Sequence, residues 1–143
     1  MVPAVRRPNT PQMHCIDEPT GDCTYERLTL CAFDAVGFAF QPSYKFLECM
    51  DFPWDEELTL AKPKKCASQV KISWSTISDC NKGARGDDLL KQASEDYVAI
   101  FPDPVYMPQA SVNGVRITTG DDTASYDAVK KAVCAAGASS PVC

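Results

Sequence analysis

Apolar residues recur every three to four positions between residues 22 and 40, which places their side chains on one face of an α-helix. Gly21-Asp22 opens this stretch, with Asp22 as the predicted N-cap, and Gln41-Pro42-Ser43 is predicted to end it. The apolar positions with helical spacing are Leu28, Cys31, Ala32, Ala35 and Ala39. The pattern therefore predicts one long amphipathic helix in this part of the chain.

A second helix is predicted directly after this break. Pro42 suits its first turn, where a proline leaves no hydrogen bond unmade. The residues predicted to face the core are Phe46, Leu47 and Met50.

Three further helical segments are predicted at about 56–72, 74–82 and 88–99. The first is expected to be interrupted near Pro63, since proline does not continue a helix interior. Asn81-Lys82-Gly83 is typical of a helix C-cap and separates the last two segments.

The pattern changes after residue 100. Residues 109–112 and 115–118 flank Asn113-Gly114, the dipeptide that most strongly favours a two-residue type I′ hairpin turn. A last helix is predicted at about 124–136. Its apolar stripe consists of Tyr126, Val129 and Val133.

This order of elements predicts an α+β fold in a single domain, residues 1–143. Prolines make residues 1–14 an extended or irregular N-terminal segment. Residues 15–100 form a cysteine-rich helical part, and residues 105–136 form the β-hairpin and the final helix.

Charge narrows the classes of partner. The net charge is −5, from 14 basic and 19 acidic residues. Nucleic acid is therefore not expected as a partner, because binding it needs a basic face. The one basic cluster, Lys62, Lys64 and Lys65, is typical of a solvated loop.

Hydropathy along the chain gives no sign of membrane insertion or secretion. A transmembrane segment needs roughly 20 consecutive apolar residues. The chain has no apolar run of that length, and its start lacks the apolar region of a secretory signal.

Eight cysteines are the main chemical feature of the chain, at positions Cys15, Cys23, Cys31, Cys49, Cys66, Cys80, Cys134 and Cys143. An even, well-spread set predicts a disulfide framework and hence an oxidising compartment. Because the targeting signal for such a compartment is not in this sequence, we expect that it was removed or lies upstream of Met1. The alternative is reduced thiols at a zinc site, but His14 has no spaced partners and no cysteines are closely paired. We therefore expect neither a metal nor a cofactor.

Helix geometry restricts how these cysteines pair. Cys23 and Cys31 lie on one predicted helix, about 12 Å apart, whereas a disulfide needs less than about 7 Å. A nearest-neighbour pattern is one of 105 connectivities for eight cysteines. Its predicted pairs are Cys15–Cys23, Cys31–Cys49, Cys66–Cys80 and Cys134–Cys143.

Two local motifs have alternative interpretations. Arg85-Gly86-Asp87 can bind an integrin when a loop displays it, but here it is predicted to begin a helix, with its acidic residue at the favourable dipole end. Cys66 follows Lys64 and Lys65, which would lower the pKa of a free thiol. The competing interpretation is that Cys66 is a paired structural cysteine.

Three stretches of the chain carry a family resemblance. They are Cys15-Ile-Asp-Glu-Pro-Thr-Gly-Asp-Cys23 with Cys31; Cys49-Met50, Cys66 and Cys80 with Gly83, Arg85 and Gly86; and Tyr106-Met-Pro-Gln-Ala-Ser-Val-Asn-Gly114 with Cys134 and the terminal Pro141-Val142-Cys143. In this order they resemble the gamma-interferon-inducible lysosomal thiol reductase (GILT) family, over about 15–143.

The resemblance implies a thioredoxin-like domain with a cysteine-rich, disulfide-linked helical insertion. Pro108 matches the cis-proline that faces the redox pair in that fold, and the Met107 backbone would bind an extended substrate. The compartment would be a lysosome, another organelle lumen or the outside of the cell.

Departures from the family suggest a truncated or degenerate domain. The family's Cys-Gln-His-Gly is Cys15-Ile16-Asp17-Glu18 here, and Glu26 replaces the usual asparagine. The family's Cys-x-x-C would lie on a strand and helix that precede residue 1, so no catalytic residue is assigned in this chain. Without that central strand the sheet has a vacant edge. The sequence is then incomplete, or a protein partner covers the edge, or the domain is reshaped.

Three functions follow from these features. A complete version would be a thiol reductase whose low-pKa cysteine attacks a substrate disulfide. A descendant without Cys-x-x-C would be a non-catalytic structural or binding subunit. A small secreted disulfide protein that acts as a ligand is the third hypothesis.

Overall fold

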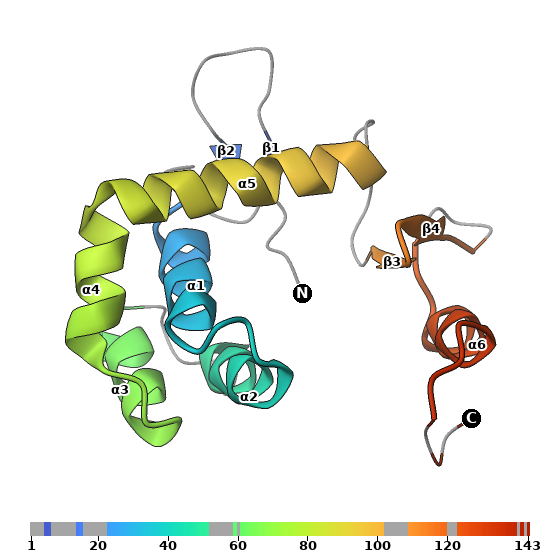
Figure 1. Ribbon diagram of the computed structural model, residues 1–143, viewed down its shortest axis with the longest axis horizontal. Coiled ribbons are helices and arrows are strands. Elements are labelled where there is room, and N and C mark those ends of the chain that lie inside the picture. Colours follow the sequence, from blue (N-terminus) through green and yellow to red (C-terminus); the bar gives the residue numbers. More distant parts are fainter. Residues whose placement is uncertain are drawn as a thin grey trace. The chain divides into compact units, whose positions relative to one another are not determined.

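The computed structural model describes residues 5–6, 14–15, 23–51, 59, 61–101, 109–119, 123–139, 141 and 143. In these residues the chain is mostly helical, with six helices and two short antiparallel sheets (Figure 1). Contacts divide the chain into two compact units, residues 1–94 and 95–143. The single domain inferred from length stays a prediction.

The first helix, α1, spans Thr24–Ala35 and ends earlier than the sequence predicts. Gly37 adopts a left-handed conformation with φ of 60° after the C-cap. The Phe38 amide then donates to the Phe33 carbonyl at 2.8 Å, and the two rings meet edge to face. This is a Schellman motif with its hydrophobic contact, and it ends the helix before the predicted break at residues 41–43.

The N-cap of α1 also differs from the prediction. Cys23, with φ of 60°, occupies that position and makes no side-chain capping hydrogen bond. Asp22, the predicted N-cap, lies outside the described residues. The Cys23 residue at this cap is buried, with 1% of its surface exposed.

The next two helices are α2, Phe40–Asp51, and α3, Ala61–Gln69. Pro42 lies in the first turn of α2, as predicted, and Phe46 and Met50 are buried on its inner face. Pro63 lies in the first turn of α3 and does not interrupt it. Most of the predicted segment between residues 56 and 60 lies outside the described residues.

Helix α4 spans Trp74–Lys82 and ends at Gly83, which confirms the predicted C-cap. Helix α5 spans Ala84–Ile100 and begins before the predicted residue 88. The predicted helix was too short at its start. Arg85-Gly86-Asp87 lies inside the first turns of α5 and does not precede it.

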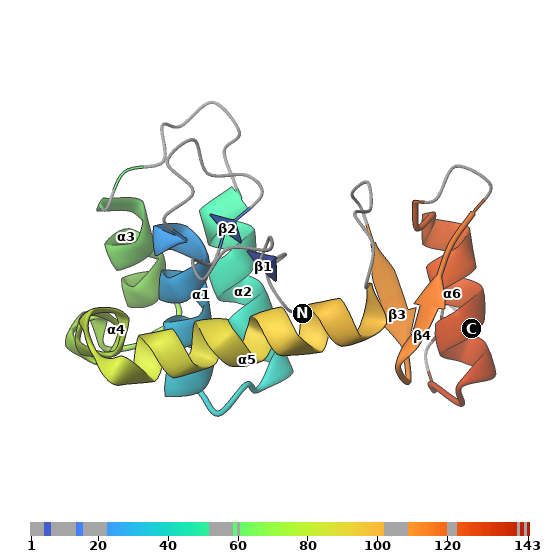
Figure 2. The same ribbon diagram turned by 90° about the horizontal axis from the view of Figure 1, so that it is seen from above.

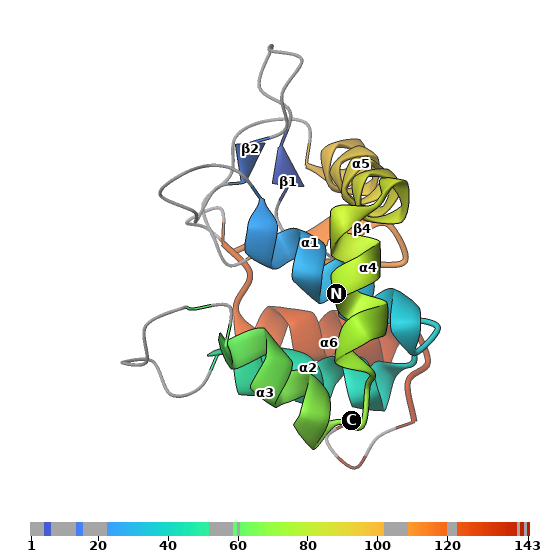
Figure 3. The same cartoon turned by 90° about the vertical axis from the view of Figure 1, so that its left-hand side faces the viewer.

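The core of the first unit lies between α1, α2, α3, α4 and the first part of α5. Helix α1 contacts α4 and α2, and α2 contacts α3, so the chain folds back on itself (Figure 3). Phe46, Leu28 and Ile77 are the largest of its fully buried aliphatic and aromatic side chains. Apolar burial of this kind supplies roughly 2 kcal/mol for each such side chain.

The second unit contains a hairpin and a helix. Strands β3, Ala110–Val112, and β4, Val115–Ile117, pair antiparallel, and helix α6, Tyr126–Ala135, contacts both (Figure 2). Asn113 and Gly114 both have positive φ, 53° and 77°. These values confirm the predicted type I′ turn, which requires positive φ at both central residues. None of the residues of α6 is buried.

The N-terminal residues contribute a small ladder. Strands β1, Val5–Arg6, and β2, His14–Cys15, pair antiparallel. The sequence predicted extended or irregular backbone over residues 1–14 and gave no sign of this pairing.

Candidate functional site

Two disulfides join helices of the first unit, residues 1–94, which we call the helical unit. Cys31 of α1 bonds Cys80 of α4, and Cys49 of α2 bonds Cys66 of α3, with Cα–Cα distances of 5.8 and 5.6 Å. The predicted pairs Cys31–Cys49 and Cys66–Cys80 are therefore wrong. The reason is the nesting of the helices: α1 packs chiefly against α4 rather than against its sequence neighbour.

The remaining cysteines with described side chains are also bonded. Cys134 bonds Cys143, as predicted, with a Cα–Cα distance of 5.4 Å. Cys23 is disulfide-bonded, whereas the side chain of its predicted partner Cys15 lies outside the described residues. Because Cys66 is bonded and 0% exposed, the hypothesis of a reactive lone thiol there is wrong. Disulfides of this kind indicate an oxidising compartment.

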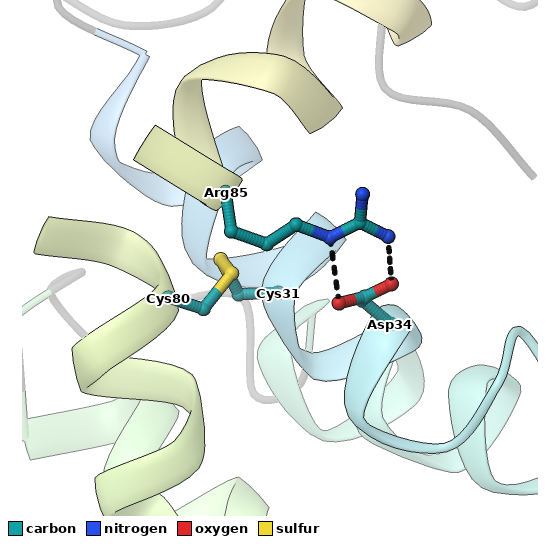
Figure 4. A network of polar contacts seen from close by, with 4 residues as sticks. All are labelled: Cys31, Asp34, Cys80 and Arg85. Atoms are coloured by element: carbon teal, nitrogen blue, oxygen red, sulfur yellow. Dashed lines mark hydrogen bonds and ion pairs between the residues drawn. A yellow bond between two sulfur atoms is a disulfide. The ribbon is translucent and has the colours of Figure 1, made fainter. Parts of the chain in front are cut away.

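An ion pair lies beside the Cys31–Cys80 bond (Figure 4). The Arg85 guanidinium donates to both carboxylate oxygens of Asp34, with Nε–Oδ2 at 3.1 Å. This hydrogen bonding lowers the pKa of Asp34 below its usual value of 3.8, although partial burial opposes the shift. The pair therefore joins the start of α5 to the end of α1, next to the disulfide that joins α1 to α4.

A second ion pair fixes the same helices. Arg27 Nη2 lies 2.8 Å from Asp87 Oδ1, and Arg27 Nη1 donates to the Asn81 carbonyl at 3.3 Å. Gly86 is buried, and a Cβ at this position would lie 2.7 Å from the Cys80 carbonyl oxygen. Close approach of α5 to α4 thus requires glycine at this position.

These contacts decide between the two interpretations of Arg85-Gly86-Asp87. Both charged side chains pair with α1, and the triplet lies within a helix rather than on a displayed loop. The structural interpretation is confirmed. Sequence reasoning missed the partners Arg27 and Asp34, which no local pattern pairs with residues more than fifty positions away.

The sheet of the second unit is contacted by α6 on both of its strands. Among the described residues no third strand pairs with β3 or β4. The Arg116 guanidinium lies 5.7 Å from the centre of the Phe101 ring and donates to Gln109 Oε1 at 3.3 Å. Val115 is 64% exposed. Met107 and Pro108, predicted as a substrate-binding wall, lie outside the described residues.

An exposed aromatic cluster at the start of α2 was also missed by sequence reasoning. Phe40 and Tyr44 stack with ring centres 5.9 Å apart and are 68% and 44% exposed. The one-turn spacing of these residues is the sequence signal that would have paired them. A shallow groove of about 270 Å³ lies between α2 and the end of α3. Its lining residues are Gln41, Pro42, Lys45, Gln69, Val70 and Lys71.

Comparisons with family models, curated proteins and solved structures find no match to this chain. In the described part of the chain, no cluster of three or more histidine, cysteine or acidic side chains is arranged to hold a metal ion. The described helices also include none with the length and apolar character that a membrane span requires.

Proposed function

We propose that this chain is a non-catalytic structural or binding subunit of a larger assembly in an oxidising compartment, related to the GILT family but without thiol reductase activity of its own. One observation carries the proposal: all the cysteines with described side chains are in disulfides. A thiol reductase needs a free thiolate in its working state, because the thiolate is the attacking group.

The kinship rests on sequence order. The cysteine spacing, the Asn113-Gly114 hairpin and the helix that carries Cys134 follow the order of the family. The truncated thioredoxin-like fold is part of the same proposal. In that fold Pro108 would be the cis-proline, and the Met107 backbone would face an extended peptide.

The proposed partner is a protein that adds a strand to the vacant edge of the hairpin. Support comes from the second unit alone, where the described hairpin has two strands, and a two-stranded sheet is marginal in water by itself. Apolar side chains also remain exposed there, with Tyr126 at 71% and Val133 at 36%. Main-chain hydrogen bonds from an added strand would complete the sheet and cover part of this surface.

Two assays on the purified chain test the proposal. The absence of catalysis predicts no insulin-disulfide reduction above the rate with the reductant alone. Robust reduction of insulin would restore the enzyme hypothesis. For the vacant edge, hydrogen exchange should be much faster in β3–β4 than in α1 of the isolated chain. Equal protection of the hairpin and α1 would show that the chain covers its own edge, which contradicts the need for a partner.

A further inference from the structure

The three disulfides with both bonded residues described differ in how accessible their sulfurs are. In the helical unit each bond joins a fully buried cysteine, Cys31 at 1% or Cys66 at 0% exposure, to a half-buried one, Cys80 or Cys49. The bond in the second unit joins half-buried Cys134 to exposed Cys143. We infer that Cys134–Cys143 is a thiol-exchange site, the bond that an external thiol opens while the helical unit stays folded.

The surroundings of this bond support selective opening. A thiolate must reach a disulfide sulfur along the S–S axis, so access limits the rate. Residues 136–139, 141 and 143 are all exposed, and α6 contributes no buried residue that opening would have to uncover. In the helical unit, by contrast, neither cysteine of a bond is exposed, and reaching the buried sulfur of Cys31 or Cys66 requires local unfolding of packed helices.

Among the described residues after α6, backbone hydrogen bonds hold Gly137 and Ala138. The Gly137 amide donates to the Cys134 carbonyl at 3.1 Å, and the Ala138 amide donates to the Val133 carbonyl at 3.3 Å. These bonds form a helix-terminating Schellman motif and do not involve either sulfur. Opening the disulfide therefore leaves the end of α6 intact and releases the described residues that follow it.

The exchange follows ordinary thiol chemistry. A thiolate attacks Cys143 Sγ, the bond between the two protein sulfurs breaks, and Cys134 leaves as a thiolate that takes a proton from water. A second thiolate then attacks the external sulfur of the mixed disulfide. Two external thiols become one disulfide, and two electrons reduce Cys134 and Cys143 to thiols.

Charge on α6 has opposing effects on this direction of attack. Lys130 and Lys131 lie one helical turn before Cys134, and cationic neighbours stabilise a thiolate leaving group. The carbonyl end of the helix opposes this stabilisation by a comparable amount. Exposure, rather than charge, is therefore the main reason for selectivity. The substrate class is a small thiol such as glutathione or an accessible protein thiol.

The experiment uses the full oxidised chain with reduced glutathione in native buffer. Samples are quenched with N-ethylmaleimide over time, and labelled cysteines are located by peptide mapping. Labels on Cys134 and Cys143 should appear at least about tenfold faster than labels on Cys31, Cys49, Cys66 and Cys80, because the latter require local unfolding. Far-ultraviolet circular dichroism should stay unchanged during the first phase.

A Cys134→Ser/Cys143→Ser variant is the matched control. It should lose the fast labelling phase and keep the slow one at the wild-type rate. Equal labelling rates at all sites in the wild-type chain would overturn the inference, as would loss of helical signal together with the first labels. The result does not depend on the proposed function, since insulin reduction and hydrogen exchange of the hairpin are measured separately.

Discussion

Removal of the Cys31–Cys80 disulfide should destabilise the helical unit more than removal of either other described bond. The bond spans 49 residues of sequence, whereas Cys49–Cys66 spans 17 and Cys134–Cys143 spans 9. In the chain-entropy model these loops correspond to about 4, about 3 and about 2.5 kcal/mol at 25 °C. Because Cys31 is buried, a Cys31→Ala/Cys80→Ala variant also loses packed sulfur atoms, which adds to the loss.

Nesting of the loops affects the size of this effect. The Cys49–Cys66 bond lies inside the Cys31–Cys80 loop and already shortens the path that the outer bond closes. The entropy of closure depends on the logarithm of loop length, so this shortening lowers the outer contribution by only a few tenths of a kcal/mol. The predicted order of the three bonds therefore does not change.

Urea unfolding without reductant measures these differences. Circular dichroism follows the helices, and linear extrapolation gives the free energy of unfolding for each double-alanine variant. A Cys134→Ala/Cys143→Ala variant is the control, because that bond lies in the other unit. If loss of Cys31–Cys80 destabilises the helical unit less than loss of Cys134–Cys143 does, the nested framework is not what holds the helices.

Other substitutions test single contacts. Gly86→Ala should destabilise the chain by about 1–3 kcal/mol in urea unfolding, because the added Cβ would press against the Cys80 carbonyl oxygen; a gain from helix propensity would contradict this close approach. Asp34 has a lowered pKa because Arg85 hydrogen-bonds it, so its contribution is present above pH about 4 and is lost at lower pH. The melting temperature of the wild-type chain should therefore fall as the pH drops below about 4, and Asp34→Asn should make this fall smaller. An unchanged dependence of melting temperature on pH would refute the pairing. Lys71 has a left-handed backbone with φ of 60°. Lys71→Gly should therefore raise the free energy of unfolding by about 0.5–1 kcal/mol in the same urea experiment; destabilisation would show that the lysine side chain matters more than backbone strain.

Local signals in the sequence predicted local structure well. Asn113-Gly114 specified a hairpin turn because it favours positive φ at both central residues. Gly83 marked the end of α4 correctly, although it adopts an extended conformation there with φ of −105°. Gly37 ends α1 in the structure through its left-handed conformation, whereas the predicted end lay at Pro42. A proline in the first turn of a helix is favourable, so its presence does not mark a helix end.

Long-range contacts were not predictable from the same signals. Cys31 has a sequence neighbour in Cys49 that suits a simple helical hairpin, yet it pairs with Cys80 because α1 packs against α4. Neither spacing nor propensity encodes which helix packs on which. The pairs Arg85–Asp34 and Arg27–Asp87 depend on the same tertiary arrangement and were missed for the same reason.

Tryptic peptide mapping of the native chain without reduction, after free thiols are blocked with N-ethylmaleimide, tests the disulfide framework most directly. Trypsin separates the cysteines of the helical unit at Arg27, Lys45, Lys65, Lys71 and Lys82. The structure predicts linked peptides that join Cys31 to Cys80 and Cys49 to Cys66, with no labelled thiol among these four cysteines. Links from Cys31 to Cys49 and from Cys66 to Cys80, or a labelled thiol at one of these positions, would contradict a chain locked by nested structural disulfides.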